Sequence, residues 1–238
     1  MQFIDTHIHL QDYKSNNAPQ IPNLYGVCKF VCVSAQESDW DKIAALSEEN
    51  PHKILPAFGL HPWYLNSVTD GWAERLEAKL RQFPAALVGE CGLDKLKPVD
   101  IELQKQVFRI QLDLATRLRR PLLVHAVKVE QELQEFLPDF AHTKTVLHSF
   151  SGSVNLMRRA AKFGAYFSFA PSALRRKSFA ELVPLLPVER ILLESDGPYQ
   201  GNPSDIPALT AKIAALRGQK VEELTAQIYK NSLEFINV

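Results

Sequence analysis

The sequence predicts an α/β protein that folds as one (β/α)8 TIM barrel over residues 1–238. Short apolar runs alternate with amphipathic stretches along the whole chain, which indicates a single α/β domain. Eight apolar runs can be counted, and a closed barrel of this kind needs eight strands. The length of 238 residues suits a barrel of roughly 250 residues. Two small domains would fit the same length, and a doubly wound open sheet is the second choice of fold.

The predicted strands are compact apolar runs such as Leu-Leu-Val and Ile-Leu-Leu. Runs of this kind are typical of strands covered on both faces, as in a parallel sheet. In chain order we expect strands at Gln2–Thr6, Lys29–Ser34, Ile54–Gly59, Ala86–Glu90, Leu122–His125, Thr145–His148, Ala165–Phe169 and Arg190–Glu194.

The predicted helices place apolar residues near helical spacing. The connection Gln11–Gly26 carries asparagines and prolines in place of this pattern, so we expect no full first helix and a barrel distorted after its first strand. Two helices close the chain, divided by Gly218. In chain order the expected helices are Trp40–Glu49, Trp72–Phe83, Leu103–Leu118, Val154–Phe163, Phe179–Leu186, Pro207–Leu216 and Val221–Phe235.

The composition excludes several classes of protein. Lysine plus arginine and aspartate plus glutamate number 27 each, so no global field gathers polyanions and any affinity for phosphate must be local. The chain shows no signal-peptide pattern and no apolar run near the ~18 residues of a membrane helix, so we expect a cytoplasmic protein without membrane contact. Cys28, Cys32 and Cys91 are expected to be buried free thiols.

Unusual polar residues lie where the predicted strands end. In barrel enzymes the C-terminal ends of the strands form the catalytic face, where strands remote in sequence deliver side chains to one centre. Each of these residues has a structural alternative, because a histidine can be a satisfied core residue and a carboxylate can belong to a turn. Their coincidence on one face favours a metal site built from His7, His9, Glu90, His125, His148 and Asp196, with His61 beside it.

The order of the strands predicts two ions. His7 and His9 are two apart on one strand and so point the same way, and in a closed barrel Asp196 on the last strand lies beside them. Glu90, His125 and His148 end three consecutive strands and can hold a second ion. Only a carboxylate has two oxygens to share, so Glu90 is the expected bridge between two metals about 3.5–4 Å apart.

The motifs that contain these residues resemble those of the TatD family of metal-dependent deoxyribonucleases, within the amidohydrolase superfamily of barrels. The resemblance implies that the six residues above are metal ligands and that His61 faces the substrate. The resemblance also implies activity with Mg²⁺ in some members. The matching stretches run in family order across nearly the whole chain: Asp5-Thr6-His7-Ile8-His9-Leu10, Gly59-Leu60-His61-Pro62, Gly89-Glu90-Cys91-Gly92-Leu93-Asp94, His125, His148-Ser149-Phe150-Ser151-Gly152 and Glu194-Ser195-Asp196-Gly197-Pro198-Tyr199.

Two segments depart from the family pattern. An aromatic residue and an arginine usually follow Gly-Leu-Asp, but this chain has Lys95-Leu96-Lys97-Pro98. After His125 the usual arginine-containing turn is replaced by Ala126-Val127-Lys128-Val129. Both segments fall where substrate would bind. The resemblance therefore supports the reaction type of the family more strongly than it supports the family's substrate. Lys97 and Lys128 are candidate replacements as phosphate contacts.

The expected reaction is metal-dependent hydrolysis of a phosphoester in DNA or an oligonucleotide. Asp196 is the expected proton acceptor and Glu90 the bridging catalytic carboxylate, while Arg175 and Arg176 are expected to contact the polynucleotide backbone. The imidazole-rich ligand set favours Zn²⁺ or Mn²⁺ over Mg²⁺. A small-molecule hydrolase acting on a lactone, amide or phosphotriester is the alternative, and a zinc-stabilised binding protein is the third. The sequence does not predict an oligomeric state.

Overall fold

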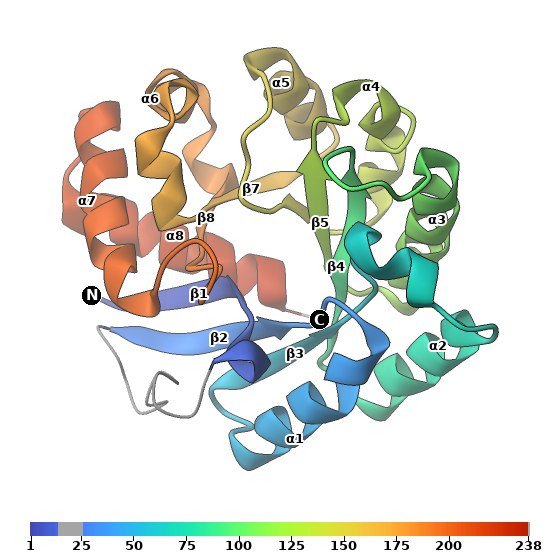
Figure 1. Cartoon of the computed structure of the whole chain (residues 1–238). Helices are drawn as coiled ribbons and strands as arrows, with labels where there is room; N and C mark the ends of the chain where they lie inside the picture. The colour runs from blue at the N-terminus through green and yellow to red at the C-terminus, as the bar shows by residue number, and fades with distance from the viewer. Residues whose placement is uncertain (14–25, 238) are drawn as a thin grey trace.

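The computed structural model describes residues 1–13 and 26–237. Eight parallel strands follow one another in sequence order around a barrel, and helices surround it (Figure 1). The expected (β/α)8 fold is therefore confirmed. The strands are β1 (Phe3–Ile8), β2 (Val27–Val33), β3 (Ile54–Phe58), β4 (Leu87–Asp94), β5 (Leu122–Val127), β6 (Thr145–Leu147), β7 (Tyr166–Phe169) and β8 (Ile191–Leu193).

The barrel closes where the segment after β8 meets β1. The amide of Asp196 donates to the carbonyl of His7 at 2.9 Å, and the amide of His9 donates to the carbonyl of Gly197 at 2.8 Å. The hydroxyl of Thr6 on β1 also donates to the carbonyl of Leu193 on β8, at 2.9 Å. These bonds bring the polar ends of the first and last strands together.

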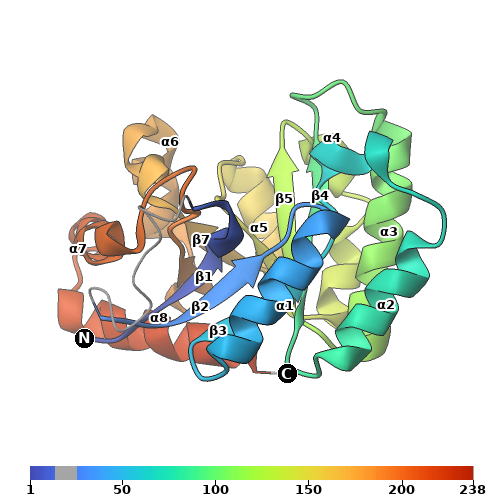
Figure 2. The ribbon, with the colours of Figure 1, turned by 60° about the horizontal axis from the view of Figure 1, so that its bottom comes forward.

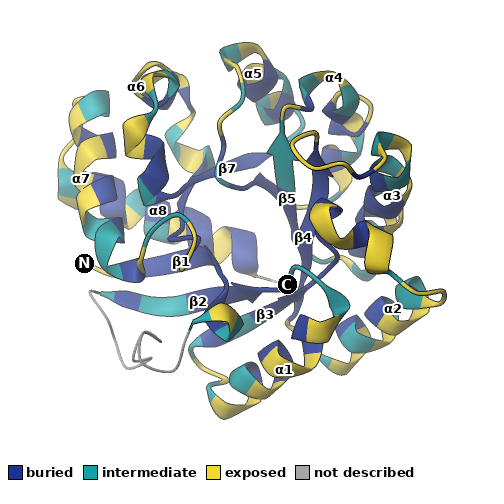
Figure 3. Ribbon diagram, viewed as in Figure 1, coloured by how far each residue is buried: buried dark blue, intermediate teal, exposed yellow. Residues whose placement is uncertain are grey.

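Helices cover the outside of the barrel, with their apolar sides toward the strands and exposed sides outward (Figure 3). No helix in residues 1–13 and 26–237 is long and apolar enough to span a membrane. The α-helices are α1 (Trp40–Glu49), α2 (Trp72–Gln82), α3 (Ile101–Leu118), α4 (Glu130–Leu133), α5 (Val154–Lys162), α6 (Lys177–Leu182), α7 (Ile206–Arg217) and α8 (Val221–Ile236). The 3₁₀-helices are η1 (Leu10–Asp12), η2 (Glu37–Asp39), η3 (Pro62–Ser67), η4 (Leu137–His142), η5 (Pro171–Arg175), η6 (Val183–Leu185), η7 (Val188–Arg190) and η8 (Pro203–Asp205).

Most expected helices are confirmed with bounds shifted by one or two residues, and two larger differences stand out. The helix expected to run to Leu186 ends at Leu182 and continues as η6, because Pro184 has no backbone N–H to donate to the carbonyl four residues earlier. The short α4 between β5 and β6 was not expected, since its four residues are too few to show a helical period. Most of the connection expected to be irregular, residues 11–26, lies outside the described residues.

One end of the barrel is plugged by apolar side chains. Alternate strand residues such as Val31, Leu123 and Leu192 fill the interior, and Phe235 of α8 packs against Tyr166 with ring centroids 5.5 Å apart. Figure 2 shows α8 running beneath the end of the barrel at which both termini lie. Because this end is closed, the C-terminal ends of the strands form the open face.

Candidate metal centre

The open face of the barrel holds a cavity of about 300 Å³. The cavity contains most of the residues predicted for the metal site, and within the described chain its lining includes neither lysine nor arginine. The lining residues are His9, Asp12, Ala35, Gln36, Asp39, His61, Trp63, Tyr64, Glu90, His125, His148, Asp196, Tyr199 and Gln200.

His7, His9 and Asp196 form the first group of potential ligands. The Nε2 atoms of His7 and His9 lie 3.3 Å apart. The Oδ1 atom of Asp196 lies 3.5 Å from His9 Nε2 and 3.8 Å from His7 Nε2. All three side chains are buried. The end of β1 and the segment after β8 therefore bring together the three residues that were expected to share one ion.

Glu90 at the middle of β4 faces two groups of histidines through its two oxygens. Its Oε2 atom lies 3.3 Å from His7 Nε2 and 3.6 Å from His9 Nε2. Its Oε1 atom lies 2.8 Å from His148 Nε2 and 2.9 Å from His125 Nδ1. One carboxylate is thus shared between the two predicted ligand groups.

His61 is as close to Glu90 as several predicted ligands are. Its Nε2 lies 3.4 Å from Glu90 Oε1, and it forms a tight donor group with Glu90 and His125. The tautomer of His61 distinguishes it from the predicted ligands. Its Nδ1 accepts a hydrogen bond from the amide of Trp63 at 3.1 Å. A neutral ring that accepts at Nδ1 carries its proton on Nε2. In this tautomer His61 points a donor into the cavity and has no free lone pair for a metal.

His125 and His148 have the opposite arrangement. His125 Nε2 lies 2.7 Å from Asp94 Oδ2, and His148 Nδ1 lies 3.4 Å from Glu194 Oε1. A carboxylate beside one ring nitrogen favours the proton there and leaves the lone pair of the other nitrogen free. The free nitrogens are the two that face Glu90 Oε1, so both rings are oriented as metal ligands.

The charges in the cavity stabilise one another. Burial would raise the pKa of Glu90, but His148, His61 and His7 hold that pKa well below its ordinary value. Burial also opposes a charge on Asp196, yet His9 and His7 lower its pKa. Burial lowers the pKa of His61 to about 4, which keeps its ring neutral. Buried carboxylates and imidazoles that converge in this way can hold divalent metal ions.

Asp94 and Trp63 were not predicted as functional residues. Besides His125, Asp94 Oδ2 accepts a hydrogen bond from the indole Nε1 of Trp63 at 2.8 Å, and its Oδ1 accepts from the amide of Leu96 at 2.6 Å. Asp94 thus fixes the His125 ring. The only sequence signal was the position of Asp94 in Gly-Leu-Asp, at the end of the strand that carries Glu90.

Comparison with known proteins decides the family. The model of the protein family described as "TatD related DNase" matches residues 4–237 of this chain. The chain belongs to the TatD family. It is 28% identical to the uncharacterized metal-dependent hydrolase YjjV of Escherichia coli, over 100% of this chain and 98% of that protein. The crystal structure of YjjV superposes with a TM-score of 0.89, at 27% identity, covering 99% of this chain and 98% of the other.

Two further TatD relatives carry activities in their names. The human deoxyribonuclease TATDN3 is 28% identical over 97% of this chain and 93% of its own length. The 3'-5' ssDNA/RNA exonuclease TatD of Erwinia tasmaniensis is 26% identical over 90% of each chain. The resemblance inferred from the motifs is therefore confirmed.

The two arginines proposed from the sequence have different surroundings in this TatD protein. Arg176 is half-buried, and its guanidinium donates to the carbonyl of Ser149 at 3.3 Å and to Gln200 Oε1 at 3.4 Å. Arg175 is exposed, and within the described residues it has no hydrogen bond or ion pair. Neither lines the metal cavity. Arg176 is thus part of the wall beside the site, whereas Arg175 is free to contact a ligand.

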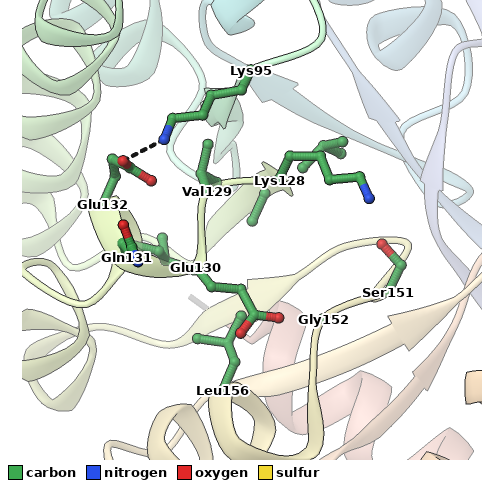
Figure 4. A pocket seen from close by; sticks show the side chains of 12 residues that line it. Lys95, Lys128, Val129, Glu130, Gln131, Glu132, Ser151, Gly152 and Leu156 are labelled. Atoms are coloured by element: carbon green, nitrogen blue, oxygen red, sulfur yellow. Dashed lines mark hydrogen bonds and ion pairs between the residues drawn. The ribbon is translucent and has the colours of Figure 1, made fainter.

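Two of the three lysines in the departing segments, Lys95 and Lys128, line a second, larger cavity of about 470 Å³. Figure 4 shows Lys95 paired with Glu132, at 2.5 Å, while Lys128 extends away from this pair toward the side of Ser151. The ammonium of Lys128 has no partner in the described part of the chain. Lys97 lies outside this cavity, with its Nζ 4.7 Å from the centre of the Trp63 ring.

Proposed function

We propose that this TatD protein hydrolyses phosphoester bonds in DNA with two divalent ions held in the metal cavity. The observation that carries the proposal is the position of Glu90, which presents one oxygen to His7 and His9 and the other to His125 and His148. Asp196 completes the first group. A shared carboxylate between two sets of imidazoles is the arrangement of a two-metal hydrolytic site.

The protein's own residues have separable roles in this reaction. Bound divalent ions supply the acidity that makes water a nucleophile near neutral pH and the positive charge that offsets the phosphoryl oxygens. Asp196 is ionised and lies at the cavity wall, so it accepts the proton that the attacking water gives up. Gln200 Nε2 donates to Asp196 Oδ2 at 2.5 Å and leaves Oδ1 toward the histidines. His61 keeps its proton and donates a hydrogen bond from Nε2 to a phosphoryl oxygen.

The ligand chemistry favours Zn²⁺ or Mn²⁺ as the ions. Four of the six ligands are imidazoles, His7, His9, His125 and His148, and imidazole nitrogen suits these metals better than Mg²⁺. The partners Asp94 and Glu194 behind two of the rings increase the basicity of the nitrogens that face the ions.

A small-molecule hydrolase of the same superfamily is the second candidate. One observation favours it: within the described chain, no lysine or arginine lines the metal cavity, and the net charge is zero. Nucleic-acid affinity depends largely on cations that neutralise phosphates. A lactone, amide or phosphotriester is uncharged at the reacting group and would need no lysine or arginine to neutralise it.

The two candidates separate in one experiment. Protein loaded with Zn²⁺ or Mn²⁺ is assayed on single-stranded DNA and on a panel of small lactones, amides and phosphotriesters. We expect cleavage of the DNA and loss of that cleavage on chelation, since the reaction needs the ions. Turnover of a small ester or amide without cleavage of DNA would replace the nuclease with the second candidate.

A further inference from the structure

Three large aromatic side chains lie exposed at the rim of the metal cavity. Trp63 is 39% exposed, Tyr64 38% and Tyr199 66%, although most large apolar side chains of the chain are buried. Trp63 and Tyr64 lie in η3, directly after His61, and Tyr199 lies in the segment after β8. Exposed apolar groups gathered at a cavity mark a binding surface.

Hydrogen bonds and ring contacts hold these side chains in place. The Trp63 indole donates to Asp94, as described above, and the Tyr199 hydroxyl donates to Asp12 Oδ2 at 3.0 Å. The Trp63 and Tyr64 rings lie edge-to-face against His61, and the Tyr199 ring lies edge-to-face against His9 at 5.4 Å. A ligand that stacks on these rings therefore has little side-chain entropy to freeze.

We propose that Trp63, Tyr64 and Tyr199 form a nucleobase-binding subsite beside the scissile phosphate. The inference rests on the proposed nuclease function and identifies the group that binds next to the reacting bond. Single-stranded nucleic acids bind through cations and through stacking on aromatic rings. The cavity lining offers rings and, within the described residues, no lysine or arginine. Stacking on the rings supplies affinity that lysine and arginine side chains would otherwise provide.

The charges around the rings agree with a base rather than a phosphate at this position. Asp12 and Asp39 line the same cavity and would repel a second phosphate there. A neutral base has no such penalty. Lys97 lies with its Nζ 4.7 Å from the centre of the Trp63 ring, so a phosphate that leaves the cavity on this side meets a cation next to the stacked base.

The test compares a short thymidine oligonucleotide with an abasic strand of equal length. The two strands carry the same phosphates and differ only in the groups that can stack. KM is measured for both with metal-loaded protein. Thymidine monophosphate and deoxyribose 5-phosphate are compared in the same way by quenching of tryptophan fluorescence, which needs no turnover. We expect both base-bearing ligands to bind roughly 10- to 100-fold more tightly, the size of one stacked base.

Variants assign the preference to the rings. Tyr199→Leu should reduce the preference for the base-bearing strand by roughly tenfold, while Tyr199→Phe, which keeps the ring and loses the bond to Asp12, should retain it. Trp63→Phe keeps a ring and loses the bond to Asp94, so it should also retain most of the preference. Leu185→Ala removes an exposed apolar side chain outside the cavity and serves as the control.

The outcomes distinguish a failure of the nucleobase subsite from a failure of the proposed nuclease function. Equal KM values for both strands in the wild type, or an unchanged preference in Tyr199→Leu, would overturn the subsite and leave the nuclease function standing. Cleavage of neither strand by metal-loaded protein would overturn both. A preference that is lost in Tyr199→Leu and kept in Tyr199→Phe supports the subsite.

Discussion

Two cavities on the barrel differ in the residues that line them. The larger, about 470 Å³, is lined by charges near solvent, among them the pair of Lys95 with Glu132 and the unpaired Lys128 of the described chain. The smaller, about 300 Å³, is lined by imidazoles and carboxylates that face one another, with no lysine or arginine among the described residues. Convergence of buried potential metal donors, and not volume, distinguishes the cavity that we propose as the active site.

The two cavities also differ in how strongly their charged groups depend on neighbours, because the groups are buried to different degrees. Glu90 is 3% exposed, so its charge is costly unless neighbouring groups stabilise it. Lys95 and Glu132 form an ion pair close to solvent, where such pairs contribute little to stability. Substitutions in the smaller cavity should therefore change metal binding and turnover, whereas matched substitutions in the larger one should change neither.

Removing the shared carboxylate should have the largest effect. Glu90→Gln keeps the size of the side chain but loses the charge that both ligand groups share, so turnover should fall at least ~100-fold and metal content should drop. Metal content is measured by elemental analysis of the purified protein. The matched control is Glu132→Gln in the larger cavity, which should retain both properties. Near-normal metal content and turnover in Glu90→Gln would contradict the shared-ligand arrangement.

The carboxylate behind His125 should have the next largest effect. Asp94→Asn leaves a side chain of the same shape but weakens its hold on the ring proton, and the loss of such a partner lowers metal affinity by roughly 10- to 100-fold. Competition with a chelator measures this affinity. Asp113→Asn, at an exposed aspartate of α3, is the control. If the two variants bind metal equally well, Asp94 does not position His125.

The neighbouring arginines should have smaller and different effects. Arg176→Ala removes the bonds to Ser149 and Gln200, and Gln200 holds Asp196, so turnover should fall by roughly three- to tenfold on every substrate. Arg175→Ala should raise KM for oligonucleotides and flatten the salt dependence of binding by about one unit. Steady-state kinetics at several salt concentrations tests both. Equal losses in both variants would point to a shared structural role.

The lysines of the larger cavity should have the smallest effects. Lys128→Ala removes an unpartnered cation and should weaken oligonucleotide binding by no more than about threefold, with a small change in salt slope. Lys95→Ala breaks a pair close to solvent and should change binding hardly at all. Fluorescence anisotropy of a labelled oligonucleotide measures both. A large loss in Lys128→Ala would make the larger cavity part of the substrate path.

The sequence predicted that the side chains of the site meet on one face of the barrel. It did not predict which ring nitrogen of each histidine carries the proton. The sequence prediction placed His7, Glu90, His125 and Asp196 at or after strand ends, and parallel strands in a barrel bring those ends to one face. In the structure β4 continues past Glu90 to Asp94, and β5 continues past His125 to Val127. The proton positions depend on contacts from loops whose paths no periodic pattern describes. The amide of Trp63 makes His61 Nε2 a donor in this way, and Asp94 beside His125 Nε2 leaves the other ring nitrogen free for the proposed metal.

The central claim, two ions shared through Glu90, is tested most directly by titrating metal-free protein with Zn²⁺ or Mn²⁺ while cleavage of single-stranded DNA is followed. We expect activity to appear only as the second equivalent binds, because both ligand groups must be filled before the phosphate is held between them. Glu90→Gln should then bind fewer than two equivalents and stay inactive. Full activity at one equivalent, or cleavage by metal-free protein, would contradict the account.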